Sequence, residues 1–455
     1  MAMNQSYNYS GKPISKGVDW VIVGLCAILV AIGILCIFMV EYKPGTNVLQ
    51  TFLGGKTNYS KQLMFGGLSA IIATFILLSD SKLFTAFANL LYAFGIMLML
   101  ATFVIGKDIK GSKSWISLGG GFNLQPAELC KIFVALSLAK YMSIQNMDFS
   151  KVRSQFIAVA IILFPALLSR LQHETGLALV YLCFFIPLYR EGLPGSVLIF
   201  GISFGVLVVA TLLVEPNLLA IILTAVAAIT IYSLRRKIKR NKNILFIVVG
   251  LWVVCVGIQR FAVPYIFNNV FECYQSQRIY SAIGKDYDCS QNNHQKLEDA
   301  ISPGAKSYKP DDYNVRQSKI AIGSGGWKGK GFLKGTQTRG KYVPAQHTDF
   351  IFTSLGEAFG LTGCLIFLSI YLFLLIRIVN IAEKQRSTFS RVYGYSVASI
   401  LFFHITVNVC MTIGLFPVIG IALPLISYGG SSLLTFTILI FIMLRLDADR
   451  QMVLR

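Results

Sequence analysis

Charged side chains are scarce in this sequence. Only 14% of its 455 residues are Asp, Glu, Lys or Arg, whereas a soluble domain has about 25%. Apolar residues make up 55% of the chain, so an ordinary soluble domain is excluded and the lipid bilayer is the expected solvent. Acidic residues are fewer than basic ones, with 21 Asp and Glu against 41 Lys and Arg, which gives a formal net charge of +20.

This positive charge has two interpretations. It suits anionic lipid headgroups or a phosphorylated lipid substrate. It equally suits the ordinary excess of Lys and Arg in the cytoplasmic loops of membrane proteins. Nucleic acid is not expected as a partner, because no soluble basic domain accompanies the charge.

Common catalytic signatures are also missing. The sequence has no Walker-type phosphate loop and no His-Glu-x-x-His pair. Energy from ATP and metal-dependent hydrolysis are therefore not expected. Seven of the nine cysteines lie in apolar runs without metal-ligand spacing, and we expect them to be small buried hydrophobes. The other two, Cys273 and Cys289, share one polar segment.

Long apolar stretches dominate the chain. A helix needs about 20 mainly apolar residues to cross the hydrocarbon core, and several of the candidate stretches are short or broken. The first stretch is a full span without a signal-peptide cleavage site, so we expect it to remain as a transmembrane helix. The twelve candidates are residues 18–40, 62–78, 83–105, 129–142, 156–168, 177–188, 196–214, 218–234, 244–263, 350–378, 392–415 and 433–446.

The basic residues of short loops predict the orientation. The densest cluster has six Lys and Arg within residues 235–242, so this loop is expected in the cytoplasm. An even number of spans then puts both termini in the cytoplasm and the long segment 264–348 outside. Because Cys273 and Cys289 lie in that segment, whose compartment can be oxidising, we predict a disulfide between them.

The outer segment, residues 264–348, is too long for a simple connector. Residues 284–312 are rich in Asn, Asp, Lys and Ser, which predicts a mobile insertion. Residues 313–348 are glycine-rich, basic and amphipathic, and we expect them to pack at the membrane surface. Within them, residues 323–339 combine six glycines with four Lys and Arg residues, Lys330 included. This composition suits diphosphate binding, but also a merely flexible and soluble loop.

Acidic residues close to a membrane are costly and usually functional. Asp349 directly follows a His-Thr pair where a long apolar helix is expected to begin. A carboxylate there could simply cap the helix, since the first N–H groups and the helix dipole favour it. Against capping stands a face of polar and small residues at helical spacing, suited to lining a cavity: Asp349, Thr353, Glu357 and Gly360.

A second polar outer loop, residues 107–126, carries Lys113 and Trp115 and leads into a further helix. A proline at a helix start and a Trp at the interface are ordinary features of membrane proteins. Glu128 and Lys131 follow at i and i+3 spacing. They could therefore pair with each other within the helix, or face a substrate.

Residues 420–432 read Gly-Ile-Ala-Leu-Pro-Leu-Ile-Ser-Tyr-Gly-Gly-Ser-Ser between two expected spans. Irregular backbone at membrane depth is tolerated only where protein or water satisfies its polar groups. The pattern therefore favours a re-entrant segment beside a cavity, and a plain turn is the alternative.

Six segments share their sequence and order with one known family. They are residues 125–131, 175–176, 317–327, 329–337, 347–352 and 424–432. Together they resemble the SEDS family, the bacterial shape, elongation, division and sporulation proteins, and the Gly-Lys-Gly-Phe-Leu-x-Gly-Thr-Gln sequence is similar to its RodA-like elongation branch. The resemblance implies an inverting glycosyltransferase of the bacterial cytoplasmic membrane that joins lipid II units into glycan strands and works with a class B penicillin-binding protein.

The resemblance also implies an architecture. RodA-like chains commonly have ten spans, so we expect an all-α polytopic membrane protein of about twelve transmembrane helices, with an inserted helical hairpin at residues 195–235. Residues 1–455 would form a single membrane domain. Its one large extracytoplasmic loop, 264–348, would carry the polar insertion at 284–312.

The resemblance implies a catalytic carboxylate in the His-Thr-Asp sequence, which is Asp349 here. Two departures are that Ala345 and Ala358 stand where the family often has glutamates, and that its usual Gln-Pro-Asp is Gln-His-Glu at 172–174. The candidate substrate-binding residues are Lys113, Trp115, Gln125, Glu128, Lys131, Glu174, Arg278, Gln317, Lys319, Lys330, Thr336, Gln337, His347, Thr348, Glu357, Ser427 and Tyr428.

The implied reaction needs a general base. This base would take the proton from the GlcNAc 4-hydroxyl of one lipid-linked sugar, while that oxygen attacks the anomeric carbon of the other and expels undecaprenyl diphosphate. A divalent cation could share the stabilisation of the diphosphate, although no ligand cluster proves it and no other cofactor is expected. Five cationic side chains could also stabilise that charge: Lys113, Lys131, Arg278, Lys319 and Lys330.

Three alternatives remain open at this point. A flippase for lipid II would also have broken helices, a polar cavity and intramembrane acids. The chain could instead be a division-type, FtsW-like member of the family. It could also be a scaffold that only recruits the penicillin-binding protein.

Overall fold

The computed structural model describes residues 17–42, 45, 52, 54–55, 57–109, 112–119, 122–144, 149, 151–271, 273–282, 285 and 310–453. The chain divides into two compact units. The first comprises Met1–Leu193, Asn314–Ile413 and Ile419–Arg455, and the second comprises Pro194–Tyr313 and Gly414–Val418. The second unit includes the residues of the expected hairpin, 195–235, and extends beyond them, while the single membrane domain stays a prediction.

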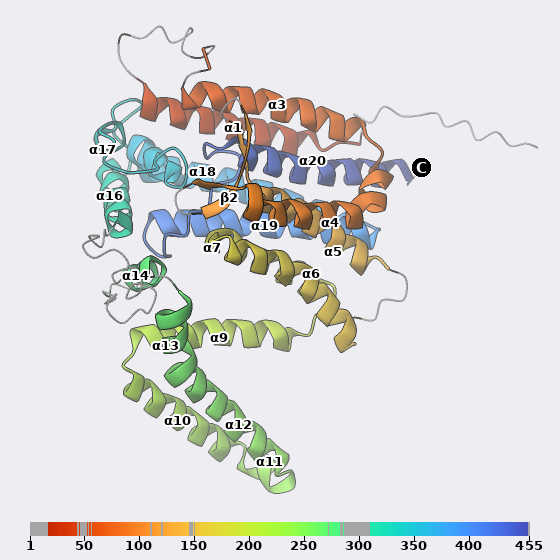
Figure 1. Ribbon diagram of the computed structural model, residues 1–455, viewed down its shortest axis with the longest axis vertical. Helices are drawn as coiled ribbons and strands as arrows, with labels where there is room; N and C mark the ends of the chain where they lie inside the picture. Colours follow the sequence, from red (N-terminus) through yellow and green to blue (C-terminus); the bar gives the residue numbers. More distant parts are fainter. Residues whose placement is uncertain are drawn as a thin grey trace, which may run out of the picture. The chain divides into compact units, whose positions relative to one another are not determined.

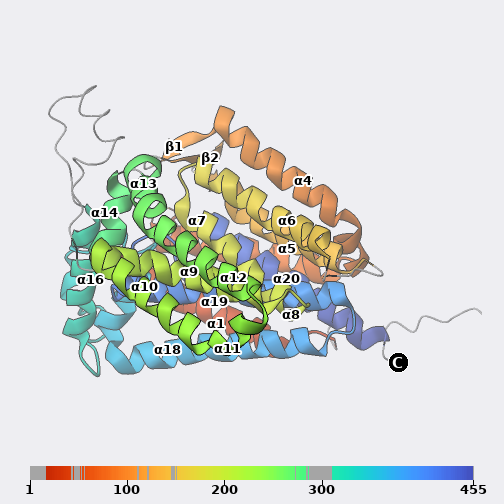
Figure 2. The same cartoon turned by 90° about the horizontal axis from the view of Figure 1, so that it is seen from below.

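The first unit is a bundle of apolar helices with α19 and α20 inside. Both are mostly buried and contact α5 (Figure 1, Figure 2). They carry buried polar side chains such as His404, Asn408 and Thr435, which in a membrane helix face protein rather than lipid. The helices are α1 (Trp20–Glu41), α3 (Asn58–Leu78), α4 (Ser81–Ile105), α5 (Pro126–Met142), α6 (Val152–Leu171), α7 (Thr175–Val180), η2 (Tyr181–Phe184), α8 (Phe185–Arg190), α16 (Pro310–Gly325), α17 (Thr336–Arg339), α18 (Ile351–Lys384), α19 (Thr388–Thr412) and α20 (Gly430–Val453).

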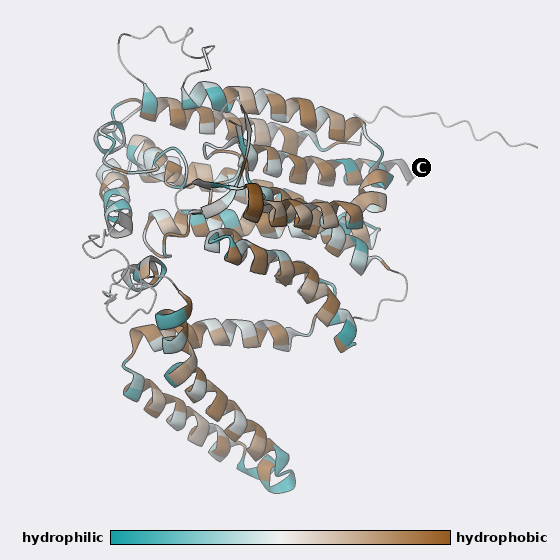
Figure 3. Ribbon diagram, in the orientation of Figure 1, coloured by the Kyte–Doolittle hydropathy of each residue, from teal (hydrophilic) through white to brown (hydrophobic). Residues whose placement is uncertain are grey.

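The second unit contains the expected hairpin and a further long helix. Its small core is formed by Leu212, Val263 and Phe267. The basic helix α11 is exposed and is hydrophilic in Figure 3, in contrast to the apolar helices beside it. The helices are α9 (Gly195–Leu213), α10 (Pro216–Ser233), α11 (Arg235–Arg240), α12 (Asn243–Gly257), η3 (Ile258–Ala262), α13 (Val263–Tyr265), η4 (Ile266–Val270) and α14 (Cys273–Ala282).

Ten helices in the described part of the chain are long and apolar enough to cross a membrane. They match ten of the twelve stretches expected from the sequence. The other two, 129–142 and 177–188, fall in the 17-residue helix α5 and in the shorter apolar helix Thr175–Arg190. The polytopic all-helical character is therefore confirmed, while the number of spans and the sidedness of both termini stay predictions.

Residues 107–124 form a small antiparallel sheet, where a loop was expected. Its strands are β1 (Lys107–Ile109), β2 (Ser112–Gly119) and β3 (Phe122–Leu124), in the order β1-β2-β3. β1 and β3 have three residues each and leave little periodicity in a sequence, because no more than one alternation fits within them.

Part of the expected outer loop is also helical, since α14, α16 and α17 lie within residues 264–348. The predicted insertion, 284–312, lies outside the described residues except for Lys285 and 310–312. Cys273 is disulfide-bonded. Because Cys289 lies outside the described residues, its pairing with Cys273 stays a prediction. The seven cysteines of the apolar runs are free thiols, and five of them are buried.

Helix α18 is interrupted at Gly360, whose φ of 64° and ψ of −163° are essentially restricted to glycine. Asp349 lies before the N-cap residue of α18 and Gly360 lies at the break, so neither shares a regular helical face with Glu357, which corrects the expectation from spacing. An unbroken helix of 34 residues would be about 51 Å long, more than the ~30 Å hydrocarbon core. The break leaves residues 361–384 long enough to span alone.

Candidate functional site

The His-Thr-Asp sequence lies just before α18 and contacts residues 420–432, which we call the 420–432 segment. The Tyr428 N–H donates to the His347 carbonyl at 2.8 Å, and the Ser427 hydroxyl donates to the Thr348 carbonyl at 2.7 Å. The His347 and Tyr428 rings lie edge to face with centroids 6.0 Å apart. Two motifs that are distant in the sequence are thus held together.

Asp349 is partly exposed at this junction. It precedes Phe350, which is the N-cap residue of α18 and makes no side-chain capping bond, so Asp349 does not occupy the capping position. Its carbonyl accepts a hydrogen bond from Asn408 Nδ2 at 2.8 Å. A Cβ atom added to Gly420 would lie 3.6 Å from Asp349 Oδ2. The carboxylate therefore lies beside the backbone of the 420–432 segment.

The 420–432 segment is anchored by polar side chains from neighbouring helices. Gln62 on α3 donates through Nε2 to the Ser427 carbonyl at 3.2 Å. Asn408 on α19 donates to the Ile421 carbonyl at 2.7 Å, in addition to its bond with the Asp349 carbonyl. Protein groups therefore satisfy this irregular backbone, which supports the re-entrant interpretation over a plain turn.

Tyr428 is half-buried close to Glu41, at the end of α1. Burial, followed by the charge of Glu41, raises the pKa of the Tyr428 phenol above its ordinary value. Because a phenol already titrates at about 10, this group stays protonated at neutral pH and can donate a hydrogen bond. Glu41 is itself held by the Asn58 N–H, which donates to it at 2.9 Å.

A buried charged cluster lies on the other side of the 420–432 segment. Lys131 Nζ is 2.7 Å from Glu128 Oε2, so the pairing within α5 that the spacing allowed is confirmed. Lys131 Nζ is also 3.0 Å from Nε2 of His404 on α19. The side chains of Lys131 and His404 are completely buried. The N–H of Gln125, the N-cap residue of α5, donates to the Ser431 hydroxyl at 3.4 Å.

Glu357 organises the glycine-rich basic loop. Its Oε1 atom accepts hydrogen bonds from Lys330 Nζ at 2.8 Å and from the N–H groups of Thr336 and Gln337 at 2.8 and 2.9 Å. Its Oε2 atom accepts from the N–H and hydroxyl of Thr338 at 2.8 and 2.7 Å. Some of the donors that were expected to bind a diphosphate are therefore used by a carboxylate of the same chain, and diphosphate binding by the loop stays a prediction.

The helix break at Gly360 exposes backbone groups that bond to the same loop. The N–H groups of Lys330 and Gly331 donate to the carbonyls of Glu357 and Ala358 at 3.0 and 2.9 Å. In the opposite direction, the Leu361 N–H donates at 2.9 Å to the loop carbonyl of residue 326. A continuous helix would use these groups internally, so the loop takes over the hydrogen bonds that the break exposes.

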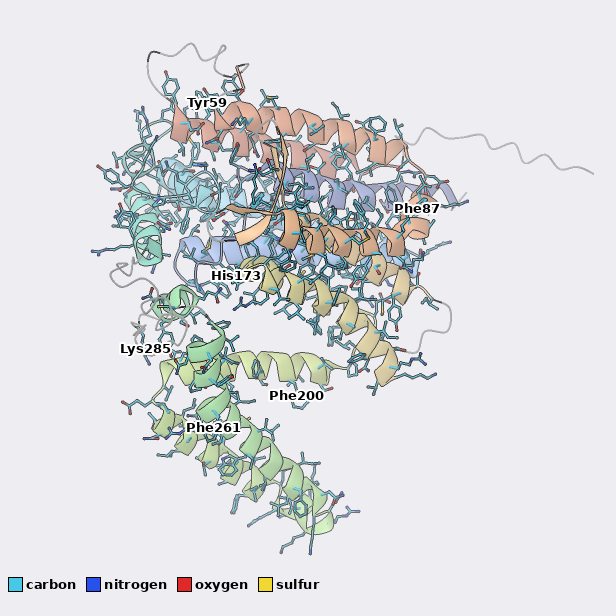
Figure 4. All side chains as sticks on the ribbon, viewed as in Figure 1. Tyr59, Phe87, His173, Phe200, Phe261 and Lys285 are labelled. Carbon is cyan, nitrogen blue, oxygen red and sulfur yellow. The ribbon has the colours of Figure 1, made fainter. Side chains whose placement is uncertain are left out.

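Trp115 and Glu174 are connected through the small sheet. Trp115 is half-buried in β2, next to Ser114, whose hydroxyl donates to Glu174 Oε1 at 2.6 Å. This bond links the sheet to the start of α7. His173 lies in an exposed turn just before it (Figure 4).

Gln317 and Lys319 flank the buried Ser318 on α16. The Ser318 hydroxyl shares a hydrogen bond with that of Thr353 at 2.6 Å and donates to the Thr412 carbonyl at 2.8 Å. These bonds hold α16 against α18 and α19, with Lys319 exposed and Gln317 half-buried. Two further candidates have side chains outside the described part of the chain: Lys113 and Arg278.

Three site residues were not selected from the sequence, namely Gln62, His404 and Asn408. Each lies in an apolar helix and supports the 420–432 segment. The available signal was a polar or ionisable side chain within a span, which usually faces protein or a cavity. Among the described residues, no group of three or more His, Cys, Asp or Glu side chains could hold a metal ion. We therefore assign no residues to the divalent cation.

Comparisons with known proteins identify the family of this chain. The FTSW_RODA_SPOVE family model, described as cell cycle protein, matches residues 19–225 and 216–452. The peptidoglycan glycosyltransferase MrdB of Escherichia coli K12 is 31% identical over 373 residues, which cover 82% of this chain and 80% of MrdB. The peptidoglycan glycosyltransferase RodA of Treponema pallidum is 28% identical and covers 94% of this chain and 97% of that protein.

A solved structure shows the same fold. One chain from a peptidoglycan synthase complex has a TM-score of 0.62 with this structure and is 21% identical to it. The match covers 95% of this chain and 98% of that chain. With its ten long apolar helices, the protein is a multi-pass protein of the bacterial inner membrane, as its relatives indicate. The chain belongs to the FtsW, RodA and SpoVE family of cell cycle proteins.

Proposed function

We propose that this chain polymerises lipid II into glycan strands on the outer face of the membrane during cell elongation. It is a peptidoglycan glycosyltransferase, as are its relatives MrdB and RodA, which it matches over most of its length. The observation that carries the proposal is the partly exposed Asp349 carboxylate, set between the His-Thr pair and the 420–432 segment.

Asp349 acts as the general base in this proposal. Its carboxylate takes the proton from the 4-hydroxyl of the acceptor GlcNAc, and the resulting oxygen attacks the anomeric carbon of the donor. The bond from that carbon to undecaprenyl diphosphate breaks, and the configuration inverts. Support comes from the backbone bonds that fix the residues around Asp349, since a base must be held in one position to be effective.

The leaving diphosphate needs positive charge, and Lys131 is the cation that the structure favours. It lies in the buried cluster that contacts the 420–432 segment through His404, where a charge acts strongly because little water screens it. The Lys330 ammonium contacts Glu357 and the Thr336 hydroxyl at 2.8 and 2.7 Å, and the Lys131 ammonium is likewise paired with Glu128, so Lys131 is preferred for its burial and not for a free charge. Lys113, Arg278 and Lys319 remain candidates for direct contact with the diphosphate.

We also propose that a class B penicillin-binding protein binds this chain and crosslinks its product. The structural neighbour comes from a complex described as coordinating polymerisation and crosslinking, which motivates the partner. At 21% identity that neighbour supports only the fold, so the surface of contact is left unassigned.

Purified full-length protein with lipid II as its only substrate tests the polymerase proposal. We expect glycan strands of many disaccharide units to form without the penicillin-binding protein. A flippase would instead move lipid II between the leaflets of a vesicle without producing strands. A scaffold would do neither, so the absence of strands under conditions where the protein is folded would contradict the proposal.

A further inference from the structure

His404 has both ring nitrogens engaged inside the bundle. Nε2 is 3.0 Å from Lys131 Nζ, and Nδ1 is 3.0 Å from the carbonyl oxygen of Ala422. An ammonium group can only donate and a carbonyl can only accept. Nε2 must therefore be the acceptor and Nδ1 the protonated donor, so the two contacts fix one neutral form of the imidazole and one orientation of its ring.

Asn408 extends this arrangement along the same face of α19. It follows His404 by four residues, which places both side chains on one side of the helix. His404 holds the Ala422 carbonyl, while Asn408 holds the adjacent Ile421 carbonyl and the carbonyl of Asp349. One helix face thus connects the buried ammonium, the backbone of the 420–432 segment and the proposed base.

We infer that His404 is a positioning residue that couples the Lys131 charge to the Asp349 site. The inference rests on the proposed polymerase function, in which these two residues carry the positive charge and the base. Through Nδ1 the imidazole holds the 420–432 segment at Ala422, and through Nε2 it keeps the ammonium directed toward that segment rather than wholly toward Glu128.

Removing the imidazole should change two things together. The Ala422 carbonyl loses its side-chain donor, so the 420–432 segment can shift relative to Asp349. The Lys131 ammonium loses one acceptor and retains the Glu128 carboxylate at 2.7 Å. The first change disturbs the position of the base, and the second moves the ammonium away from the charge that develops on the leaving diphosphate. Both weaken interactions that act mainly in the transition state, so they should lower kcat more than they change KM.

Three substitutions separate the two contacts. His404→Asn places an amide nitrogen near the position of Nδ1 and keeps the bond to Ala422 alone. His404→Gln places an amide oxygen near the position of Nε2 and keeps the contact with Lys131 alone. His404→Leu keeps neither. Ser399→Ala is the matched control, because Ser399 is buried on the same helix and its hydroxyl bonds only to the Tyr395 carbonyl in the hydrogen bonds described.

Polymerase kinetics with lipid II, measured per folded molecule, form the first readout. We expect His404→Leu to lower kcat by ~10- to 100-fold, the usual effect of losing a group that orients an active residue, with KM changed less than about threefold. His404→Asn and His404→Gln should each recover part of the loss, and Ser399→Ala should match the wild type. A wild-type kcat in His404→Leu, or equal losses in all three variants, would overturn the inference.

Hydrogen exchange gives a second readout that needs no turnover. The Tyr428 N–H is bonded to the His347 carbonyl, and the Leu423 N–H to the Ser427 hydroxyl. Both should exchange faster in His404→Leu than in the wild type and Ser399→Ala. Unchanged exchange would remove the anchoring role even if kcat fell. Faster exchange in a protein that never polymerises lipid II would keep the anchoring role and reject the polymerase proposal instead.

Discussion

Asp349 and Glu357 occupy neighbouring positions in the sequence but very different surroundings. Glu357 is completely buried, and both of its oxygens accept hydrogen bonds from the glycine-rich loop. Asp349 keeps an exposed part and lies against the 420–432 segment. A carboxylate already surrounded by its own chain has little capacity left for a substrate. The comparison supports our proposals that Glu357 holds the loop in place and that Asp349 is the general base.

The largest expected effect on stability comes from Glu357→Ala, which tests whether Glu357 stabilises the glycine-rich loop. The substitution leaves Lys330 and several loop N–H groups without their acceptor. We expect the free energy of unfolding to fall by about 3 kcal/mol. This is toward the lower end for breaking a buried ion pair, because Lys330 stays partly exposed. Thermal unfolding in detergent measures it. The control is Glu383→Ala on the same helix, whose ion pair with Arg190 is exposed and should matter little. Unfolding of both variants at the wild-type temperature would contradict the role of Glu357.

The second effect concerns the helix break that brings the loop to Glu357. An Ala at Gly360 would have to adopt a conformation that costs on the order of 1–3 kcal/mol. Its Cβ would also lie 2.4 Å from the Gly329 nitrogen, which forces the loop to move. We expect Gly360→Ala to lower the unfolding temperature clearly. Gly67→Ala is the control, since a Cβ at Gly67 meets nothing within 4 Å. Equal stability of the two variants would show that the break is not required.

The smallest effect is expected from cysteine substitutions that test on which side of the membrane each loop lies. They should leave stability unchanged. Both the loop held by Glu357 and the Asp349 site are predicted to lie outside the membrane. Cysteines introduced at the exposed positions Lys334 and Arg236 should therefore react with a membrane-impermeant thiol reagent from opposite sides, the first from outside and the second from the cytoplasm. Labelling of Lys334→Cys from the cytoplasm alone would invert the predicted topology.

Much of this site was accessible from the sequence because its residues lie in distinct motifs. The sequence selected the His-Thr-Asp sequence, the Glu128–Lys131 pair and the 420–432 segment. The pairing of Glu128 with Lys131 is confirmed, while the roles of all three in binding and catalysis stay predictions. Their mutual contacts were not predictable, because spacing along the chain does not reveal which distant backbone carbonyl a side chain will meet. Asn408 shows this limit, since its two acceptors belong to segments on either side of it in the sequence.

The roles of the two acids were harder to predict than their positions. Helical spacing placed Asp349, Glu357 and Gly360 on one face, but Asp349 lies before the helix and the φ of 64° at Gly360 interrupts it. The same glycine-rich loop that suggested a diphosphate site provides the donors for Glu357. Composition predicted an anion site in this loop. It could not reveal that several of the loop's donors bind a carboxylate of the same chain, and diphosphate binding stays a prediction.

The most direct test of the account measures polymerase rate and thermal stability together on the wild type, Asp349→Asn and Glu357→Gln, with lipid II as substrate. Asparagine keeps the size of the aspartate side chain and removes its basicity. We expect Asp349→Asn to unfold at the wild-type temperature and to polymerise on the order of 10²- to 10⁴-fold more slowly, the contribution of a positioned base. Glu357→Gln should lose stability while each folded molecule keeps most of its rate. A near-wild-type rate in Asp349→Asn, with the rate lost in folded Glu357→Gln, would contradict the account and make Glu357 the base.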